Sequence, residues 1–307
     1  MTKLVYTPNI PFDMHDWRNL QSIREVAAGC NSLLAVLNDG SVLYKSANAE
    51  QLKGNLPYQR LFANCFSPDP VNGGPMPLLC WKNIVKADCS KYMDDTFIGL
   101  RKDGTCLAYT ARPSGRRIVE DWTDIVEVAA SDAFFGLDRN GEVHHIHLTT
   151  DRYNHDDYFE TEFWHDIEHI RGGVCNSVFG ITSEGKVVCE GGNCSQRIKD
   201  ACAEKEDVVD IYVTGSEAQD VFFLHKDGSF SCLDKWFIFP YESDLFVQFA
   251  GHWSKTVFAI QKDRTLVPLS KGMPDKITDT VLEWSPVMSI AFGQKNYDPP
   301  FAVAVLE

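Results

Sequence analysis

The sequence predicts an all-β fold, a seven-bladed β-propeller closed by pairing of its N-terminal and C-terminal strands. Three observations indicate this fold. A two-residue turn recurs between β-rich runs, a tryptophan motif precedes most of these runs, and the last repeat stops short of its turn. A period of roughly 40 residues is typical of propellers, in which each repeat supplies one sheet.

The recurring turn is Asp-Gly or a close equivalent. Its copies are Asp39-Gly40, Asp103-Gly104, Asn140-Gly141, Glu184-Gly185 and Asp227-Gly228, and Asp263-Arg264 takes the sixth place. Such pairs suit type I′ hairpins, because both central residues need a positive φ. The residue four positions before each turn is small in five of the six repeats. The six residues are Ala35, Gly99, Gly136, Gly180, Phe223 and Ala259, of which Phe223 is the large one. We expect small residues where strands crowd near a common axis.

A tryptophan followed two residues later by Asn or Asp precedes four of the hairpins. These residues are Trp17, Trp81, Trp122 and Trp164, and Trp284 begins a seventh repeat. We expect all five to be structural. Trp253 and Trp236 lie outside this register. The apolar residues of 235–241 cannot all face one side of a strand, so this run is either an exposed contact patch or an outer strand covered by the next blade.

The last repeat predicts how the ring closes. Residues 301–306 match the strand before each turn, and the chain ends where the turn is due. Residues 3–6 resemble the strand after a turn, so we expect them to complete the last sheet and remove its exposed edge. The expected blades of this single domain, 1–307, are four-stranded. They lie near 9–56, 78–112, 118–150, 160–195, 204–240, 243–272 and 280–307 plus 1–8, with an insertion at 57–77.

Composition narrows the class of protein. The formal net charge of −14 argues against direct binding of a phosphate backbone and favours a protein partner. No apolar stretch has the roughly 18 residues that a bilayer span needs, and the N-terminus does not read as a signal peptide. Ten cysteines without a disulfide-framework spacing indicate reduced thiols, so we expect a cytoplasmic protein.

No residue pattern predicts catalysis. The sequence has neither a nucleophile motif nor a phosphate-binding glycine loop. Six of the nine histidines fall between His144 and His169, and His145 and His147 share a strand face near His155. Zinc binding is the alternative to ordinary surface histidines. Because the spacing of the histidines matches no metal signature, we expect no metal. We also expect no cofactor and no small-molecule substrate.

The loops opposite the Asp-Gly turns vary in sequence and carry acidic and aromatic residues. Acidic groups around aromatic anchors suit a protein-binding rim, although charged loops can also be merely solvated. The predicted partner-binding residues, together with Trp236, are Tyr92, Asp94, Asp95, Asp132, Glu217, Trp253, Tyr297 and Asp298.

The repeat resembles that of the regulator-of-chromosome-condensation family. The residues that carry the resemblance are Ala28-Gly29, Ser32, Ala35, Asp39-Gly40, Val42 and Tyr44, followed by 48–52, with an echo at Gly191-Gly192-Asn193 and Gln196. The resemblance covers essentially the whole chain and implies a seven-bladed propeller that acts as a binding platform rather than an enzyme.

We therefore predict a non-catalytic protein-interaction scaffold or regulator that uses one loop face of the propeller. Three alternatives stay open. The first is an inhibitor or antagonist with an acidic rim, and the second is a guanine-nucleotide exchange factor for a small GTPase. The third is an enzyme with a site in the central channel, which a channel lined only by Ala, Gly and aliphatic residues would exclude.

Overall fold

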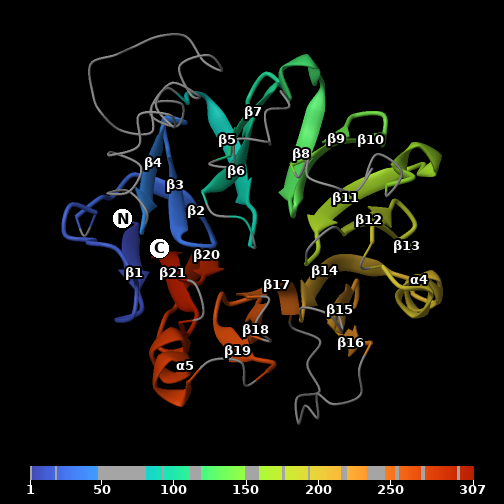
Figure 1. Cartoon of the computed structure of the whole chain (residues 1–307). Helices are drawn as coiled ribbons and strands as arrows, with labels where there is room; N and C mark the ends of the chain where they lie inside the picture. Colours follow the sequence, from blue (N-terminus) through green and yellow to red (C-terminus); the bar gives the residue numbers. More distant parts are fainter. Residues whose placement is uncertain are drawn as a thin grey trace.

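The structure is a computed structural model. It describes residues 2–17, 19–47, 81–91, 93, 95–110, 119–148, 159–174, 177–192, 194–215, 220–233, 246–252, 256–270, 274–295 and 298–307. The predicted insertion at 57–77 lies outside them. Seven antiparallel sheets follow one another around a ring, from blade one in blue to blade seven in red (Figure 1). The predicted seven-bladed propeller is therefore confirmed.

Each sheet has an inner, a middle and an outer strand. The inner strands are β2 (Ile23–Gly29), β5 (Ile84–Cys89), β8 (Ile125–Ala130), β11 (Ile167–Gly172), β14 (Val208–Thr214), β17 (Phe246–His252) and β20 (Val287–Gly293). The middle strands are β3 (Ser32–Leu37), β6 (Thr96–Arg101), β9 (Ala133–Asp138), β12 (Val178–Thr182), β15 (Asp220–His225), β18 (Thr256–Gln261) and β21 (Phe301–Leu306). The outer strands are β4 (Val42–Ser46), β7 (Cys106–Thr110), β10 (Val143–His147), β13 (Val187–Glu190), β16 (Phe230–Cys232), β19 (Leu266–Pro268) and β1 (Lys3–Tyr6).

The predicted closure of the ring is confirmed. Strand β1 pairs with β21 over four residues, from Lys3 opposite Leu306 to Tyr6 opposite Val303. The backbone N–H of Thr7 then donates to the carbonyl of Ala302 at 3.0 Å, which extends the pairing by one residue. The two ends of the chain lie side by side in Figure 1. The last blade is thus built from both termini, and its middle strand has a partner on each side.

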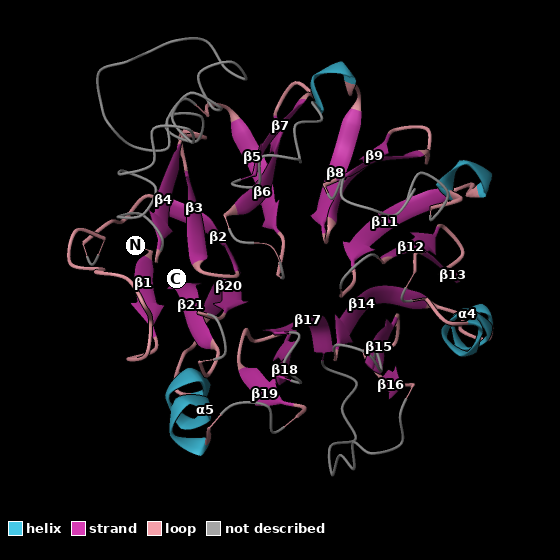
Figure 2. Ribbon diagram, viewed as in Figure 1, coloured by secondary structure: helices cyan, strands magenta, loops and turns pink. Residues whose placement is uncertain are grey.

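The expected fourth strand is absent from the described residues. Blades four and six instead continue into the short helices α4 (Gln196–Ala203) and α5 (Asp275–Leu282), at the rim of the ring in Figure 2. In each helix, two buried residues four positions apart face the sheet: Ile198 with Cys202, and Ile277 with Val281. A helix therefore covers the outer edge of each of these two blades. Two short 3-10 helices, η1 (Val119–Asp121) and η2 (Thr161–Phe163), lie elsewhere on the rim.

The Asp-Gly turns join neighbouring blades. Gly40, Gly104 and Gly185 have φ near +80°, and the carbonyl of each accepts a hydrogen bond from the first backbone N–H of the next inner strand, at Ile84, Ile125 and Val208. A Cβ at Gly40 would lie 2.8 Å from the Cα of Asn83 in the next blade. Glycine is thus required both for its positive φ and for the close approach.

The residue four positions before each turn is small for a different physical reason from the one expected. It lies on the middle strand, and in three blades a tryptophan indole covers it rather than a neighbouring strand near the axis. A Cβ at Gly99 would lie 2.7 Å from the ring of Trp81, and Gly136 and Gly180 meet Trp122 and Trp164 in the same way. All five tryptophans of the motif are at most 8% exposed, which confirms their structural role.

Candidate functional site

One position of every inner strand forms a β-bulge at the turn end of the ring. In all seven blades the pairing register shifts between the first and third residues of the inner strand, so the second residue has no partner. The seven bulge residues are Arg24, Val85, Val126, Glu168, Val209, Val247 and Met288. A bulge re-aims the side chain of its extra residue, and here it turns these side chains out of the sheet.

Five of the seven bulge residues are aliphatic and exposed. Their exposed fractions run from 39% at Val85 and Val247 to 50% at Met288, and they account for five of the seven large exposed apolar side chains among the described residues. Arg24, Val85 and Met288 also line the central channel. We name this set of Val85, Val126, Val209, Val247 and Met288 the aliphatic ring, because its members occupy the same bulge position on five of the seven inner strands.

The carboxylates of the Asp-Gly turns lie on the same face as the aliphatic ring. Asp39, Asp103, Asp227 and Asp263 each accept hydrogen bonds from the side chain and backbone N–H of the Ser or Thr two residues on. These bonds lower the pKa of each carboxyl, so the four stay ionised at neutral pH. The turn face therefore presents an apolar centre, and farther out it carries these carboxylates beside the exposed basic residues Lys102, Arg139, Lys226 and Lys262 of the same turns.

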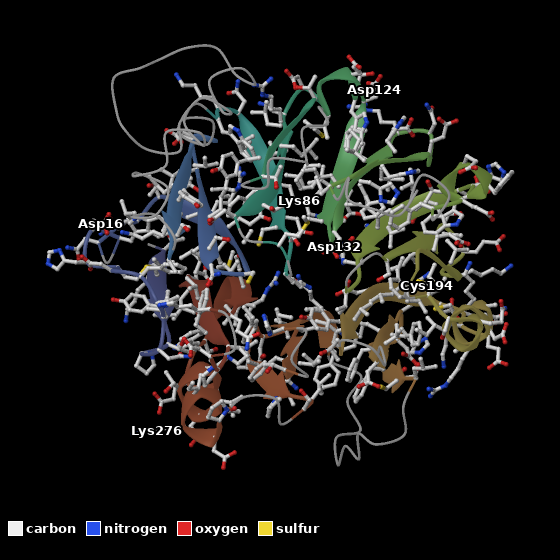
Figure 3. The ribbon with its side chains drawn as sticks, viewed as in Figure 1. Asp16, Lys86, Asp124, Asp132, Cys194 and Lys276 are labelled. Carbon is white, nitrogen blue, oxygen red and sulfur yellow. The ribbon has the colours of Figure 1, made fainter. Side chains whose placement is uncertain are left out.

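The inner strands enclose a central channel of about 520 Å³, and residues of all seven line it. Its lining includes the charged residues Arg24, Glu25, Lys86, Asp88, Lys91 and Arg171. Lys86, labelled in Figure 3, belongs to this inner group. The channel is thus not lined only by Ala, Gly and aliphatic residues, and the condition that would exclude a channel enzyme is not met.

Polar side chains of the inner strands connect one blade to the next. The carboxylate of Glu127 accepts the N–H of Ile170 at 2.8 Å, and that of Asp210 accepts the N–H of Phe249 at 3.0 Å. The N–H of Val26 donates to Ser289, and that of Ala130 donates to Asp88. Each acceptor lies one blade before its donor, with blade seven preceding blade one. These side chains form an inter-blade belt, which explains their presence without catalysis.

A chain of ion pairs strengthens the belt across blades two to five. Arg171 donates to Glu127 at 2.8 Å and to Asp210 at 3.0 Å, while Lys86 donates to Glu127 at 2.6 Å. Although burial opposes ionisation of Glu127, the hydrogen bond from His169 and the charges of Arg171 and Lys86 hold its pKa well below the usual range. Glu25 has the equivalent place in blade one, where burial raises its pKa to about 7.

Three of the predicted partner-binding residues are described. Asp298 is exposed, and Asp132, labelled in Figure 3, is half-buried at the β8–β9 hairpin. Asp95 is only 1% exposed, and its carboxylate accepts the hydroxyls of Tyr44 and Ser46 from blade one. It therefore joins two blades and offers no charge to a partner. The other predicted residues, Tyr92, Asp94, Glu217, Trp236, Trp253 and Tyr297, lie outside the described residues.

The histidines of β10 pack against aromatic and hydroxyl groups. The ring of His147 stacks on Phe159 with centroids 4.7 Å apart, and His145 lies 3.2 Å from the hydroxyl of Thr161. Within the described part of the chain, Asp138, Glu142 and His144 bring three possible metal-ligand atoms together. The Asp138 carboxylate already accepts the N–H groups of Asn140 and Glu142, so it serves the turn. His155 lies outside the described residues.

The aliphatic ring and the belt were not predicted from the sequence. A strand period of two places the second residue of each inner strand on the face opposite the first and third, and gives no sign that it leaves the sheet. Aligning the repeats on the Trp motif would have shown the signal. The residue after the first Ile, Val or Phe is aliphatic in five repeats, and a hydrogen-bonding side chain follows in all seven.

Comparison with known proteins finds the same fold among solved structures. No family model and no curated protein sequence matches the chain. The structure of Prp20p from Saccharomyces cerevisiae superposes with a TM-score of 0.55 at 13% identity, over 97% of this chain and 84% of that one. Human WBSCR16 superposes with a TM-score of 0.59 at 12% identity, over 94% and 87%. A yeast RCC1 (Prp20) bound to Kap60 gives 0.55 at 14%, over 97% and 82%.

These likenesses define the fold of the protein. The chain has the same seven-bladed propeller fold as these RCC1 and RCC1-like structures, which is the fold that the repeat resemblance implied, and at such low identity the likeness shows the fold alone. Among the described helices, none combines the length and the apolar character needed to span a bilayer.

Proposed function

We propose that the protein is a non-catalytic scaffold or regulator that binds a protein partner on its turn face. The aliphatic ring is the observation that carries this proposal. Apolar side chains gathered on one face of a soluble protein mark an interaction surface more often than scattered ones do. Here the same bulge presents an aliphatic side chain in five blades, so a single contact centred on the channel mouth would cover all five.

The chemistry of the face suggests the partner. An apolar anchor would bury the aliphatic ring, and Lys or Arg side chains flanking it would meet the ionised turn carboxylates. The chain carries 43 acidic against 29 basic residues, which favours encounter with a basic partner. We therefore propose a partner segment with apolar residues between basic ones.

The solved relatives support protein binding as the general activity. Prp20p is described with binding properties to Gsp1p and histones, and yeast RCC1 is described bound to Kap60. The exchange-factor and inhibitor predictions are narrower forms of the same proposal. Release of labelled nucleotide from a panel of small GTPases tests the first, and a steep salt dependence of association would favour the second.

A displayed peptide library tests the proposal without knowledge of the natural partner. We expect the wild-type protein to enrich peptides in which apolar residues are flanked by Lys or Arg. Val126→Asp and Met288→Asp place a charge in the aliphatic ring and should weaken binding of an enriched peptide by about tenfold or more. Val126→Ile keeps the apolar contact and should bind as the wild type does.

Variants on the opposite face decide which surface is used. Asp132→Asn and Asp298→Asn remove loop-face charges and should leave binding of the same peptides unchanged. Equal melting temperatures across the set would show that every variant is folded. If the loop-face variants lose binding while the ring variants keep it, the partner binds the loop face predicted from the sequence and the turn-face proposal is wrong.

A further inference from the structure

In the half of the central channel nearest the loop face, one wall carries small residues and the opposite wall carries polar ones. The fifth residue of each inner strand faces this region, and the seven are Ala27, Asp88, Ala129, Arg171, Tyr212, Ala250 and Ala291. Blades six, seven and one are consecutive around the ring and all carry alanine. The wall across from them carries Asp88, Arg171 and Tyr212. Space left by the alanines therefore faces polar side chains.

Lys91 enters this space from the loop after β5. Its Nζ lies 4.5 Å from the centroid of the Tyr212 ring, and the side chain lines the channel. Burial lowers the pKa of this amine. Arg24, Lys86 and Arg171 each donate to a carbonyl or a carboxylate. Among the described channel residues, Lys91 is the cation with no hydrogen-bond acceptor.

Tyr212 supplies an independent sign of a missing ligand. Its side chain lines the channel and the residue is 8% exposed, yet its hydroxyl has no hydrogen-bond partner among the described residues. A buried hydroxyl without a partner costs stability, and native proteins rarely leave one unpaired. An unpaired hydroxyl and an unpaired ammonium thus belong to two residues that line the same channel.

We propose that the loop-side half of the channel binds a small oxyanion, a carboxylate or phosphate group, between the ammonium of Lys91 and the hydroxyl of Tyr212. Both groups can donate, and an oxyanion has enough lone pairs to accept from both. The alanine walls of blades six, seven and one leave room for the rest of a small molecule. This proposal does not depend on the turn-face proposal, because it uses the other end of the channel.

Asp88 is the nearby negative charge that such an anion must tolerate. Its two carboxylate oxygens accept the backbone N–H groups of Cys89 and Ala130, at 2.9 Å each. These bonds direct the carboxylate into the strand and the next blade. Arg171 is held by Glu127 and Asp210, so its charge is already compensated. The free donors of Lys91 and Tyr212 therefore set the preference for an acceptor ligand.

Calorimetric titration of the whole protein with inorganic phosphate and with succinate, at matched ionic strength, tests the site. We expect saturable binding of at least one of them with one site per chain. Lys91→Met should weaken it by about tenfold or more and Tyr212→Phe by about threefold or more. Lys102→Met removes an exposed lysine from a turn on the other face and should change nothing.

The outcomes separate the possibilities. Binding of phosphate alone or of succinate alone would both support the site and would identify which source of oxyanion it prefers. Ala291→Leu fills the opposite wall without touching either donor, so it should also abolish binding and covers the case that Lys91→Met does not fold. Absence of binding by both probes, or binding that Lys91→Met and Ala291→Leu leave unchanged, would overturn the proposal.

Discussion

Lys205 lies over the ring of Phe223, with its Nζ 5.2 Å from the ring centroid. This pair occupies the place where blades two, three and four set a tryptophan against a glycine. Lys205 stands three residues before the first residue of its inner strand, as the tryptophans do, and Phe223 stands four before its turn. Blade five thus fills the same volume by exchanging which of the two positions carries the aromatic ring.

This exchange predicts strong coupling between the two positions. Phe223→Gly should leave a cavity and cost about 3–5 kcal/mol in the free energy of unfolding. Lys205→Trp alone should also destabilise the protein, because the indole and the Phe223 ring compete for one space. The double variant rebuilds the Trp–Gly pair, so we expect it to be clearly more stable than Phe223→Gly. Denaturant unfolding of all four proteins measures the coupling, and additive costs would contradict it.

The sixth turn predicts a stabilising substitution. Arg264 has a φ of +67° where the other turns carry glycine. A side chain in this left-handed region costs about 1 kcal/mol, so Arg264→Gly should raise the melting temperature. Gly104→Ala, at φ +82° and with its new Cβ 3.2 Å from the Cα of Asp124, should lower it. Equal melting temperatures for Arg264→Gly and wild type would argue that Arg264 makes a compensating contact.

The two belt glutamates predict opposite dependences on pH. Burial raises the pKa of Glu25 from 4.5 to about 7, so the folded protein holds a proton that the unfolded chain releases between these values. Stability from this group is complete below about pH 4.5 and is lost as the pH rises to 7. Glu25→Gln keeps an acceptor for the N–H of Ala87 and should be about 1–3 kcal/mol more stable than wild type at pH 8.

Glu127 is the control for this prediction. Its pKa is lowered in the folded protein. Its contribution to stability is therefore present above pH 4.5, the pKa in the unfolded chain, and is lost on acidification. Glu127→Gln should therefore be less stable than wild type at pH 7, with a difference that shrinks toward low pH. Unfolding curves at pH 4, 6 and 8 measure both. Parallel behaviour of the two variants would contradict the assigned environments.

Ring closure predicts a strong effect of the N-terminal strand. Leu4 is 5% exposed and pairs with Val305, so deleting residues 2–8 should lower the free energy of unfolding by at least about 3 kcal/mol. A synthetic peptide of residues 2–8, added in excess, should restore much of the lost melting temperature. A peptide with Leu4→Asp is the matched control and should not. Unchanged melting after the deletion would show that β1 does not stabilise the ring.

The sequence predicts the seven-bladed ring and its closure, but not the contacts between the blades. Closure was predictable because residues 3–6 complete a pattern that the chain leaves open at Leu306. The burial of Asp95 was not, because its donor Tyr44 lies 51 residues away and on another blade. Nor were the helices α4 and α5 that follow the outer strands of blades four and six in place of an expected fourth strand, since both helices are only eight residues long. Long-range contacts of this kind leave no local period to detect.

Hydrogen exchange on a complex with a bound peptide or partner tests the central claim most directly. We expect added protection at the Asp-Gly turns and at the first residues of the inner strands, around Val126, Val209 and Met288. Protection there should be lost with Val126→Asp. Protection confined to the opposite face, at the β8–β9 hairpin around Asp132 and at Asp298, would contradict the proposal that this propeller binds its partner through the aliphatic ring.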